Sequence, residues 1–463
     1  MSENPASRDK TATEKVAEFV ASLAYDDIPD SVAGVARIAF LDWLGVTIAG
    51  SKEPGSLIIA EHARKTAARN EASAICQGFM TTAELAALVN GTASHALDYD
   101  DTFPSTVHYN MHPSVCIFPA VLALAEKHGL SGRKALAAYV TGMEVLYYTG
   151  FAIADAIPKS GWHPTPVIGT MGAAAGCANI LGLDSSQVRH ALGIAASLAG
   201  GLLKNFGSMT KTMHAGNAAR NGVIAAELAA SGFTSNSSIF DGEFNFSQMF
   251  GGKESGGPPD VEIGPSKDWK LASEGIGFKL YPSCRSTHSS IDATLYLRQK
   301  FNISPEQVAE ITCGINRLHT QLARFHRPET GYQGKFSIPY CVATVLRNGK
   351  ISLEDFTDDR VKDPETQELL SKVNFEHPAE LNRGAMNLTA EIAIRLKDEA
   401  QHSHRVSFPR GEPENPATDE EMIAKFKNCS GLVLKKQDLD KILGPATHLD
   451  EIENVAGLFE ALR

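Results

Sequence analysis

The chain of 463 residues lacks the cysteine pattern of a metal-binding or disulfide-rich protein. Its seven cysteines are scattered, and no two of them have C-x-x-C spacing. An odd, dispersed set without a secretory signal indicates reduced thiols, and it disfavours a structural zinc or a Cys-ligated iron–sulfur cluster. The chain also has no run of 18 apolar residues and no hydrophobic signal core at its N-terminus. We therefore expect a cytoplasmic protein with no membrane partner.

Signatures of nucleotide and nucleic-acid binding are lacking as well. There is no Walker A motif, and the glycine-rich stretch 251–257 follows no hydrophobic strand, so it is interpreted as a loop. The formal net charge of −11 argues against nucleic acid as a partner. Patches rich in cations therefore stand out against the overall charge balance.

The length and the pattern of apolar residues predict two domains, the first of them helical. Residues 11–245 show one amphipathic or apolar helical run after another, and Val32–Ile48 is apolar enough to be a buried helix. Further helices are predicted at 16–23, 82–90, 114–128, 132–151, 167–181 and 185–203. Ser131, Asp184 and Ser185 mark helix starts.

The pattern of apolar residues changes after a connecting segment at 246–269. Residues 310–315 and 391–396 alternate with period two, and an extended run follows to Phe408, so strands are expected there. Ser304 and Ser352 have the spacing of helix starts. We predict a mainly α fold with an α+β insert. Its helical domain comprises 11–272 and 409–463, so that the last helices pack back on the first domain, and its α+β domain comprises 273–408.

The most informative stretch is Phe206–Gly222, which sets Lys211, His214 and Arg220 among small residues. Small residues allow close backbone approach, and a few cationic groups among them suit a buried pocket for an anion. Lys211 could stabilise a carboxylate or an oxyanion, and Arg220 could clamp a carboxylate bidentately. A structural ion pair is an equal alternative for Arg220.

A second motif reads H-A-L-D-Y-D-D-T-F at 95–103. Its three aspartates, Asp98, Asp100 and Asp101, repel one another, so a solvated loop and a metal site are both open interpretations. The spacing does not match an EF-hand calcium loop.

Two His-Pro pairs, His112-Pro113 and His163-Pro164, each precede an apolar helical run. Proline favours the first helical position, which predicts that each histidine is an N-cap residue. The helix dipole there lowers the pKa of the imidazole, and a neutral imidazole can move a proton. A plain helix-start turn is the more common meaning of a single His-Pro pair.

The fourth motif, F-K-L-Y-P-S-C-R-S-T-H at 278–288, gathers Lys279, Arg285 and His288 around Cys284. Cys284 is interpreted as a packed thiol, since no paired base is evident. Tyr340 could be a phenolic acid or base, or simply a core residue.

These four motifs, in this order, resemble the MmgE/PrpD family over nearly the whole chain. The family includes 2-methylcitrate dehydratase, cis-aconitate decarboxylase and iminodisuccinate epimerase. The resemblance implies a helical domain from both chain ends, an α+β lid between them, and a metal-free homodimer without cofactors whose active site lies between the domains. It implies a pocket built from seven residues: Asp98, Thr102, His112, His163, Lys211, Lys279 and Tyr340.

One departure concerns P-S-T-V-H-Y-N-M at 104–111, which is longer than expected of the decarboxylases and makes His108 a rival of His112. Thr102, His108, His214, Arg220, Arg285 and His288 complete the candidate substrate contacts. The chemistry in this family moves a proton at a carbon next to a carboxylate, and Lys211 and Lys279 could neutralise the enediolate.

We expect a lyase acting on a small di- or tricarboxylate, first of all a hydro-lyase like 2-methylcitrate dehydratase. In that reaction Asp98, held neutral by its neighbours, or a second histidine would protonate the leaving hydroxyl. A cis-aconitate decarboxylase or an epimerase of an amino-dicarboxylate is the alternative. A non-catalytic anion-binding protein of the same fold is the alternative of another class.

Overall fold

The computed structural model describes residues 9–66, 68–104, 111–153, 156–252, 255, 263–264, 268–382 and 387–463. The chain divides into two compact units. The first unit comprises Met1–Ala96, Tyr109–Gly275 and Met422–Arg463, and the second comprises Leu97–His108 and Ile276–Glu421. The architecture is mainly helical with an α+β part, as predicted. The division groups 97–108 and 409–421 with the second unit, whereas the sequence analysis assigns them to the helical domain.

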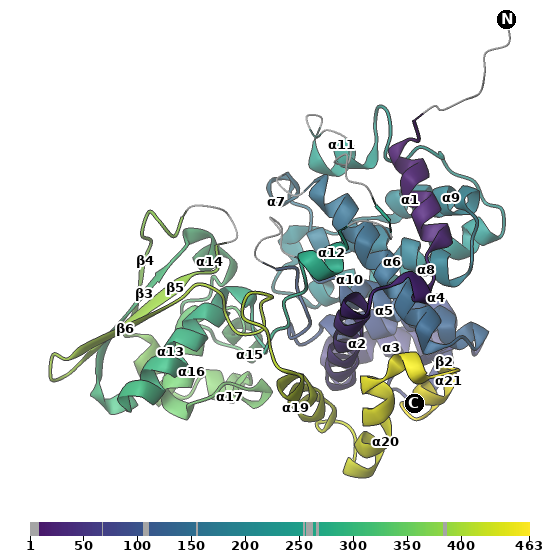
Figure 1. Cartoon of the computed structure of the whole chain (residues 1–463). Helices are drawn as coiled ribbons and strands as arrows, with labels where there is room; N and C mark the ends of the chain where they lie inside the picture. The colour runs from purple at the N-terminus through teal and green to yellow at the C-terminus, as the bar shows by residue number, and fades with distance from the viewer. Residues whose placement is uncertain are drawn as a thin grey trace, which may run out of the picture. The chain divides into compact units, whose positions relative to one another are not determined.

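The first unit is a stack of helices (Figure 1). Its helices before the second unit are α1 (Ala12–Ser22), α2 (Asp30–Gly50), α3 (Pro54–Thr66), α4 (Ala83–His95), α5 (Ser114–His128), α6 (Gly132–Phe151), α7 (Ile157–Ser160), α8 (Pro164–Ile180), α9 (Ser185–Leu198), α10 (Met209–Ala230), α11 (Phe246–Gly251) and α12 (Lys270–Ser273). A two-stranded hairpin of β1 (Ala72–Ala74) and β2 (Phe79–Thr81) interrupts the series and was not predicted.

Helix α2 is strongly apolar and lies in the core, as the sequence predicts. It is the one described helix that is long and apolar enough to cross a membrane, but 78% of that apolar stretch is buried inside the protein. A core helix shows this combination. Its Asp42 side chain pairs with Lys425 Nζ at 2.5 Å, and both side chains are buried.

Small residues let the central helices approach closely. Helix α4 packs on α10 where Gly91 meets Gly216, and a Cβ on Gly216 would lie 2.3 Å from the Leu88 carbonyl oxygen. Helix α6 packs on α8 in the same way, with Gly142 against Gly172. The glycines therefore determine how closely these helix pairs approach.

The C-terminal helices pack in the first unit. They are α19 (Asp419–Ser430), α20 (Lys436–Thr447) and α21 (Ala456–Glu460). Helix α20 packs on α2, and α21 packs on α5. Figure 1 shows these helices in yellow beside the early helices in purple and blue.

The second unit is built on a four-stranded sheet in the order β4-β3-β5-β6. Its strands are β3 (Val308–Ile315), β4 (Val373–Glu376), β5 (Ala390–Leu396) and β6 (Gln401–Val406). β3 pairs with β4 in parallel and with β5 antiparallel, and β5 and β6 form an antiparallel pair. Strands β3, β5 and β6 match the predicted extended runs.

Helices cover one face of this sheet (Figure 1). The helices of the unit are α13 (His288–Phe301), α14 (Arg317–Leu322), α15 (Gly331–Gly334), α16 (Ile338–Asn348), α17 (Asp358–Val361) and α18 (Pro364–Leu370). Apolar residues of α13 and α16 form one core with the inward-facing residues of β3 and β5.

Two helix starts predicted in this unit lead only to single 3-10 turns. Ser304 forms its capping box, yet the helix ends at Gln307 because the alternating pattern of β3 begins at Val308. Ser352 opens a turn of only three residues, Leu353–Asp355. A cap satisfies backbone donors at a helix start but does not fix the length of the helix, which the apolar pattern decides.

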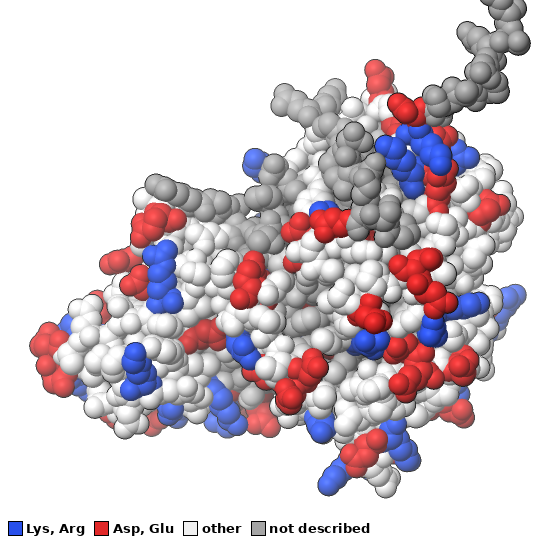
Figure 2. Space-filling model, viewed as in Figure 1, with Lys and Arg blue, Asp and Glu red and all other residues white. Residues whose placement is uncertain are grey.

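Figure 2 shows acidic and basic side chains interspersed over the face that it presents. The net charge of −11 is therefore not gathered into one region of the described part of that face.

Candidate active site

Four imidazoles and one lysine of the first unit lie at the ends of its closely packed helices. His95 is the last residue of α4, and His112 lies two positions before α5. His163 is the N-cap of α8, and Lys211 and His214 lie in the first two turns of α10. All five side chains are buried.

The rings of these histidines form a continuous cluster. The ring centroids of His95 and His112 lie 4.4 Å apart, and those of His95 and His163 lie 6.5 Å apart. His163 contacts His214 through the two Nδ1 atoms, which are 3.0 Å apart. Phe206 meets the His163 ring edge-on at 4.8 Å, and Lys211 Nζ lies over the Phe206 ring at 5.4 Å. We call these five residues, His95, His112, His163, Lys211 and His214, the imidazole cluster.

Two histidines of the imidazole cluster, His163 and His214, are held neutral. Burial is the main cause that lowers the pKa of His163 well below its usual range, and Lys211 adds to this effect ahead of the other histidines. Burial also lowers the pKa of His214 to about 4, assisted by His95 and Lys211. A neutral imidazole in a buried site can give or take one proton, and Lys211 supplies positive charge.

The N-cap prediction is correct for His163 and wrong for His112. Pro164 is the first residue of α8, so His163 caps that helix. In α5 the N-cap position belongs to Pro113, because the helix begins only at Ser114. The His112 backbone N–H instead donates to Thr165 Oγ1 at 3.2 Å. The low pKa of His163 comes from burial before any other cause, whereas the sequence analysis attributed it to the helix dipole.

His95 is a member of the cluster that the sequence analysis did not single out. It begins the motif H-A-L-D-Y-D-D-T-F, but it ends an alanine-rich helix and resembles a core residue by its pattern. The close packing of Gly91 against Gly216 brings the end of α4, which carries His95, to the start of α10.

The second unit holds a buried ion pair between Lys279 and Asp98. Lys279 Nζ lies 3.3 Å from Asp98 Oδ1 and donates to the Asp98 carbonyl oxygen at 2.8 Å. Asp98 has a positive φ of 53°, and Lys335 Nζ donates to the neighbouring Leu97 carbonyl oxygen at 2.6 Å. Two ammonium groups therefore hold the turn that carries Asp98.

Thr102 and Arg285 fix the rest of this segment. The Thr102 N–H donates to the Gly277 carbonyl oxygen at 2.9 Å, and the bond from the Gly277 N–H to the Thr102 carbonyl oxygen completes a bridge. Arg285 donates through Nε to Glu412 at 2.8 Å, through Nη2 to the same carboxylate, and through Nη1 to the Phe103 carbonyl oxygen. These contacts give Arg285 a positioning function, and its contact with substrate stays a prediction.

Other candidate residues have partners in the core of the second unit. His288 Nε2 bonds the Ser283 carbonyl oxygen at 3.2 Å, and burial lowers the His288 pKa to about 3. Tyr340 is buried in the core and donates its hydroxyl to the Asp355 carbonyl oxygen. Burial raises the pKa of the Cys284 thiol, which suits a packed thiol rather than a nucleophile.

Two candidates remain. His108 lies outside the described residues, so its rivalry with His112 stays open. Arg220 is half-buried on α10, and no ion pair of its guanidinium is found within the described ranges.

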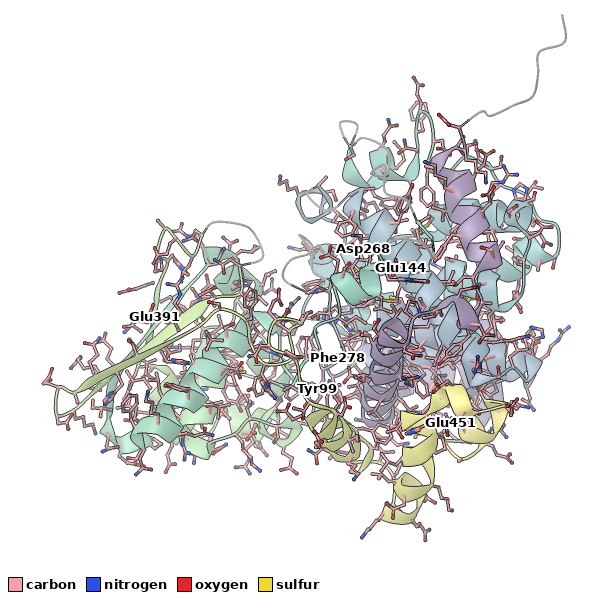
Figure 3. The ribbon with its side chains drawn as sticks, in the orientation of Figure 1. Tyr99, Glu144, Asp268, Phe278, Glu391 and Glu451 are labelled. Atoms are coloured by element: carbon pink, nitrogen blue, oxygen red, sulfur yellow. The ribbon has the colours of Figure 1, made fainter. Side chains whose placement is uncertain are left out.

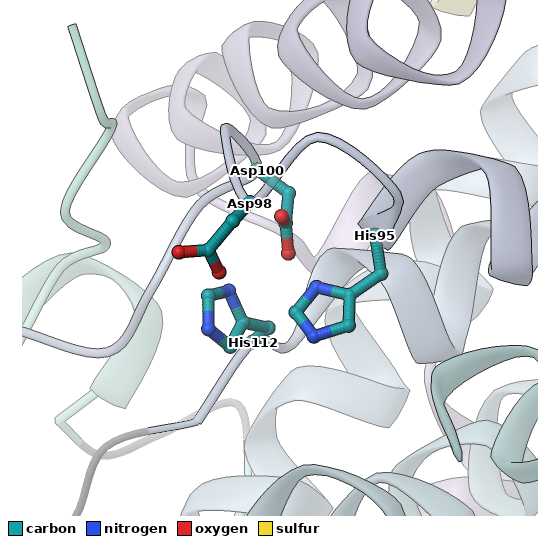
Figure 4. Close-up of side chains that lie close together, drawn as sticks. All are labelled: His95, Asp98, Asp100 and His112. Atoms are coloured by element: carbon teal, nitrogen blue, oxygen red, sulfur yellow. The ribbon is translucent and has the colours of Figure 1, made fainter. Parts of the chain in front are cut away.

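Metal-ligand chemistry is available from His95 and His112, which Figure 4 draws together with Asp98 and Asp100. The two imidazoles belong to the first unit and the two carboxylates to the second. Imidazole nitrogens are ligands that Zn²⁺ and similar ions accept. The sequence predicts no metal, and the presence of these donors is a reason to test that prediction by experiment.

The family models and the relatives that match this chain agree with one another. The model of the MmgE/PrpD N-terminal domain matches residues 14–257, and that of the MmgE/PrpD C-terminal domain matches residues 281–449. Cis-aconitate decarboxylases of Mus musculus and Homo sapiens are each 29% identical to this chain, over 98% of this chain and 94% and 95% of theirs. The cis-aconitate decarboxylase of Aspergillus terreus is 26% identical, over 97% of this chain and 95% of its own.

Proposed function

The chain belongs to the MmgE/PrpD family, and from this premise we propose that it decarboxylates a small unsaturated tricarboxylate of the cis-aconitate type. The similarity to cis-aconitate decarboxylases supports an enzyme of the lyase type. The sequence motifs by themselves favour a 2-methylcitrate dehydratase first and the decarboxylase second. The named relatives favour the second.

The observation that carries the proposal is the imidazole cluster. Burial, Lys211 and the neighbouring imidazoles all lower the pKa of His163, so this imidazole stays neutral beside a buried ammonium group. A carboxylate group of the substrate could bind beside this buried ammonium through charge-assisted hydrogen bonds. Neutral imidazoles then provide the one proton that the reaction needs.

The reaction requires little more than these groups. The bond between a carboxylate carbon and its neighbouring carbon breaks, CO₂ leaves, and the electron pair stays on the substrate, delocalised toward a remaining carboxylate. Lys211 stabilises this added negative charge as a preorganised cation in a dry site. One neutral imidazole donates a proton to the carbanion, a C–H bond forms, and an unsaturated dicarboxylate results.

A dehydratase needs a further acid for the leaving hydroxyl, and the contacts of Asp98 count against that role. The sequence analysis considered Asp98 as a neutral acid. Its carboxylate lies 3.3 Å from the Lys279 ammonium, and a nearby positive charge favours the ionised carboxylate, which has no proton to give.

The test is NMR of the purified protein with cis-aconitate and, separately, with 2-methylcitrate, in deuterated water. We expect CO₂ release from cis-aconitate and one deuterium on carbon in the product, because the proton comes from an exchangeable group. Alkene formation from 2-methylcitrate alone would establish the dehydratase instead. Deuterium exchange without net product would indicate an epimerase, and no change in either acid would refute the proposal.

A further inference from the structure

His163 and His214 meet through chemically identical atoms. The two Nδ1 atoms lie 3.0 Å apart, and both side chains are buried. A hydrogen bond between two ring nitrogens requires one N–H and one lone pair. Each ring of the pair is therefore confined to one tautomer, and the two tautomers are opposite.

We propose that His214 is a positioning residue that donates its Nδ1–H to Nδ1 of His163, so that His163 carries its own proton on Nε2. The proposal rests on the proposed function, since a decarboxylase needs a proton donor and this tautomer makes His163 Nε2–H that donor. In the opposite arrangement Nε2 of His163 would carry a lone pair instead of a proton and would act as a base.

The surroundings allow one ring position for this contact. The His163 N–H donates to the Gly201 carbonyl oxygen at 2.9 Å, which fixes its backbone. A Cβ on Gly201 would lie 3.3 Å from His214 Cγ and Nδ1 and 2.5 Å from Pro166 Cγ, so a larger residue there would displace the pair. Phe206 meets the other side of the His163 ring edge-on. The rings cannot turn freely, so the contact requires opposite tautomers in the two rings, and the direction of donation is what we propose.

Burial keeps the pair free of extra protons. The titratable groups that act on it are Lys211, His95 and His112, and those that act on the His163 pKa all lower it. An imidazolium in either ring would bring a second positive charge into a buried site that already holds the Lys211 ammonium, which is unfavourable. The pair is thus most stable with two protons in total, one on each ring.

The proton balance follows from this tautomer. The N–H bond at His163 Nε2 breaks, and a C–H bond forms on the substrate carbanion. The negative charge left on the pair is offset by Lys211, and water returns one proton to the pair after the product leaves. His214 loses no proton to the substrate in this step and so acts only through His163.

The deciding measurement is ¹⁵N NMR of the histidine-labelled protein, in which the two ring nitrogens of a neutral imidazole differ strongly in shift. The 15 histidines require assignment by difference, with His163→Gln and His214→Asn as the assigning variants. We expect the His163 signal to show a protonated Nε2 and a bare Nδ1. A protonated Nδ1 on His163 would overturn the proposal, whatever the substrate.

A kinetic comparison separates positioning from mere packing. In His214→Asn the side-chain amide nitrogen can lie close to the position of the original Nδ1 and still donate a hydrogen bond. His214→Leu removes the donor and keeps a side chain of similar size. With cis-aconitate we expect His214→Leu to lower kcat by about 100-fold with KM within about threefold, in the range for loss of one positioned proton-transfer group. His214→Asn should recover most of kcat.

Equal kcat values for the two variants would contradict the proposal, as would a wild-type kcat in His214→Leu. If His214→Leu does not fold, the wild-type tautomer and the activity of His214→Asn still decide. Absence of decarboxylation would refute the proposed function, but the tautomer would remain measurable in the resting protein. The two failures are therefore distinguishable.

Discussion

Lys211 and Arg220 are two cations of one helix with different surroundings. Lys211 is only 3% exposed and lies within the imidazole cluster, whereas Arg220 is half-buried and lies nearer the middle of α10. The sequence presents both as cations among small residues. Burial and the neighbouring imidazoles distinguish them, and those depend on helix packing that the sequence does not display.

We expect Lys211→Ala to lower kcat for decarboxylation by about 100-fold or more, the usual cost of removing one preorganised charge-stabilising group. Steady-state kinetics with cis-aconitate measure this. The matched control is Arg220→Ala on the same helix, which should change kcat less than tenfold. A Lys211→Ala enzyme with normal turnover and a normal circular dichroism spectrum would remove the lysine from the mechanism.

Acid should destabilise the protein through the buried histidines. An unfolded imidazole titrates near pH 6.5, whereas in the folded chain His214 titrates near 4 and His163 also titrates lower than usual. Below pH 6.5 the unfolded chain therefore binds more protons than the folded chain. The free energy of unfolding should be fully present above about pH 6.5 and should fall as the pH drops toward 4.

Urea unfolding at pH 7.5, 6 and 5 tests this, followed by the same series on His214→Asn. The variant should lose stability less steeply with acid because one titrating group is gone. A variant whose stability depends on pH as steeply as that of the wild type would show that His214 does not carry the effect.

Residue types were easier to predict than residue partners. Lys279 and Arg285 stand out in the sequence as cations near small residues, but their partners are Asp98, 181 positions away, and Glu412, 127 positions away. No local pattern indicates such pairs. The buried pair of Arg285 and Glu412 shows that a conspicuous cation can hold a loop in place, because both its charge and its donors are already used.

At the scale of elements, helix contacts depend on single glycines. Gly216 of α10 would place a Cβ 2.3 Å from the Leu88 carbonyl oxygen and 2.4 Å from Thr92 Oγ1, both on α4. These contacts are too short for any side chain, so the two helices would have to separate. The end of α4 carries His95, and the start of α10 carries Lys211 and His214.

We expect Gly216→Ala to lower the free energy of unfolding by about 2–3 kcal/mol, as overpacking of a core usually does, and to reduce decarboxylation as well. Gly444→Ala in α20 is the control, because no atom lies within 4 Å of the added Cβ. That change should be neutral or stabilising by up to about 1 kcal/mol, through helix propensity. Equal effects of both substitutions on urea unfolding would contradict the close-packing account.

Long, strongly patterned helices were predicted well. Helices α5 (Ser114–His128) and α6 (Gly132–Phe151) have the predicted bounds. Helix α5 ends at Gly129 in the left-handed conformation, and α6 begins after Ser131, whose side chain accepts from the Lys134 N–H. Short elements such as α12 were not predicted. Their stability comes from distant partners: the carboxylate of Glu144, labelled in Figure 3, accepts from the backbone N–H groups of Lys270 at 3.1 Å and Leu271 at 2.9 Å.

For the whole molecule, metal independence is an expectation that a chelator can test. We expect dialysis against EDTA to leave decarboxylation and thermal stability unchanged, because protonation and charge stabilisation can be supplied by histidines and lysine. Elemental analysis before and after dialysis is the control. Lost activity that returns with one divalent ion would show that a metal is required and would direct attention to His95 and His112.

The fold class and the family motifs could be predicted for the whole molecule because both depend on patterns repeated over long stretches. The assignment of residues 97–108 to the second unit could not be predicted. It depends on the bridge of Thr102 with Gly277 and on the contacts of Lys279 and Lys335. Those contacts join segments more than 170 positions apart.

The chain passes between its two units at four places: after residues 96, 108, 275 and 421. Neither unit is therefore a contiguous gene segment. A truncated gene for residues 1–275 would lack α20 and α21 and would keep only a short piece of the second unit. Exchange of parts between relatives would need matched breakpoints at several of these places at once. We therefore expect natural variation in this lineage to arise by point substitution and loop change more readily than by domain shuffling.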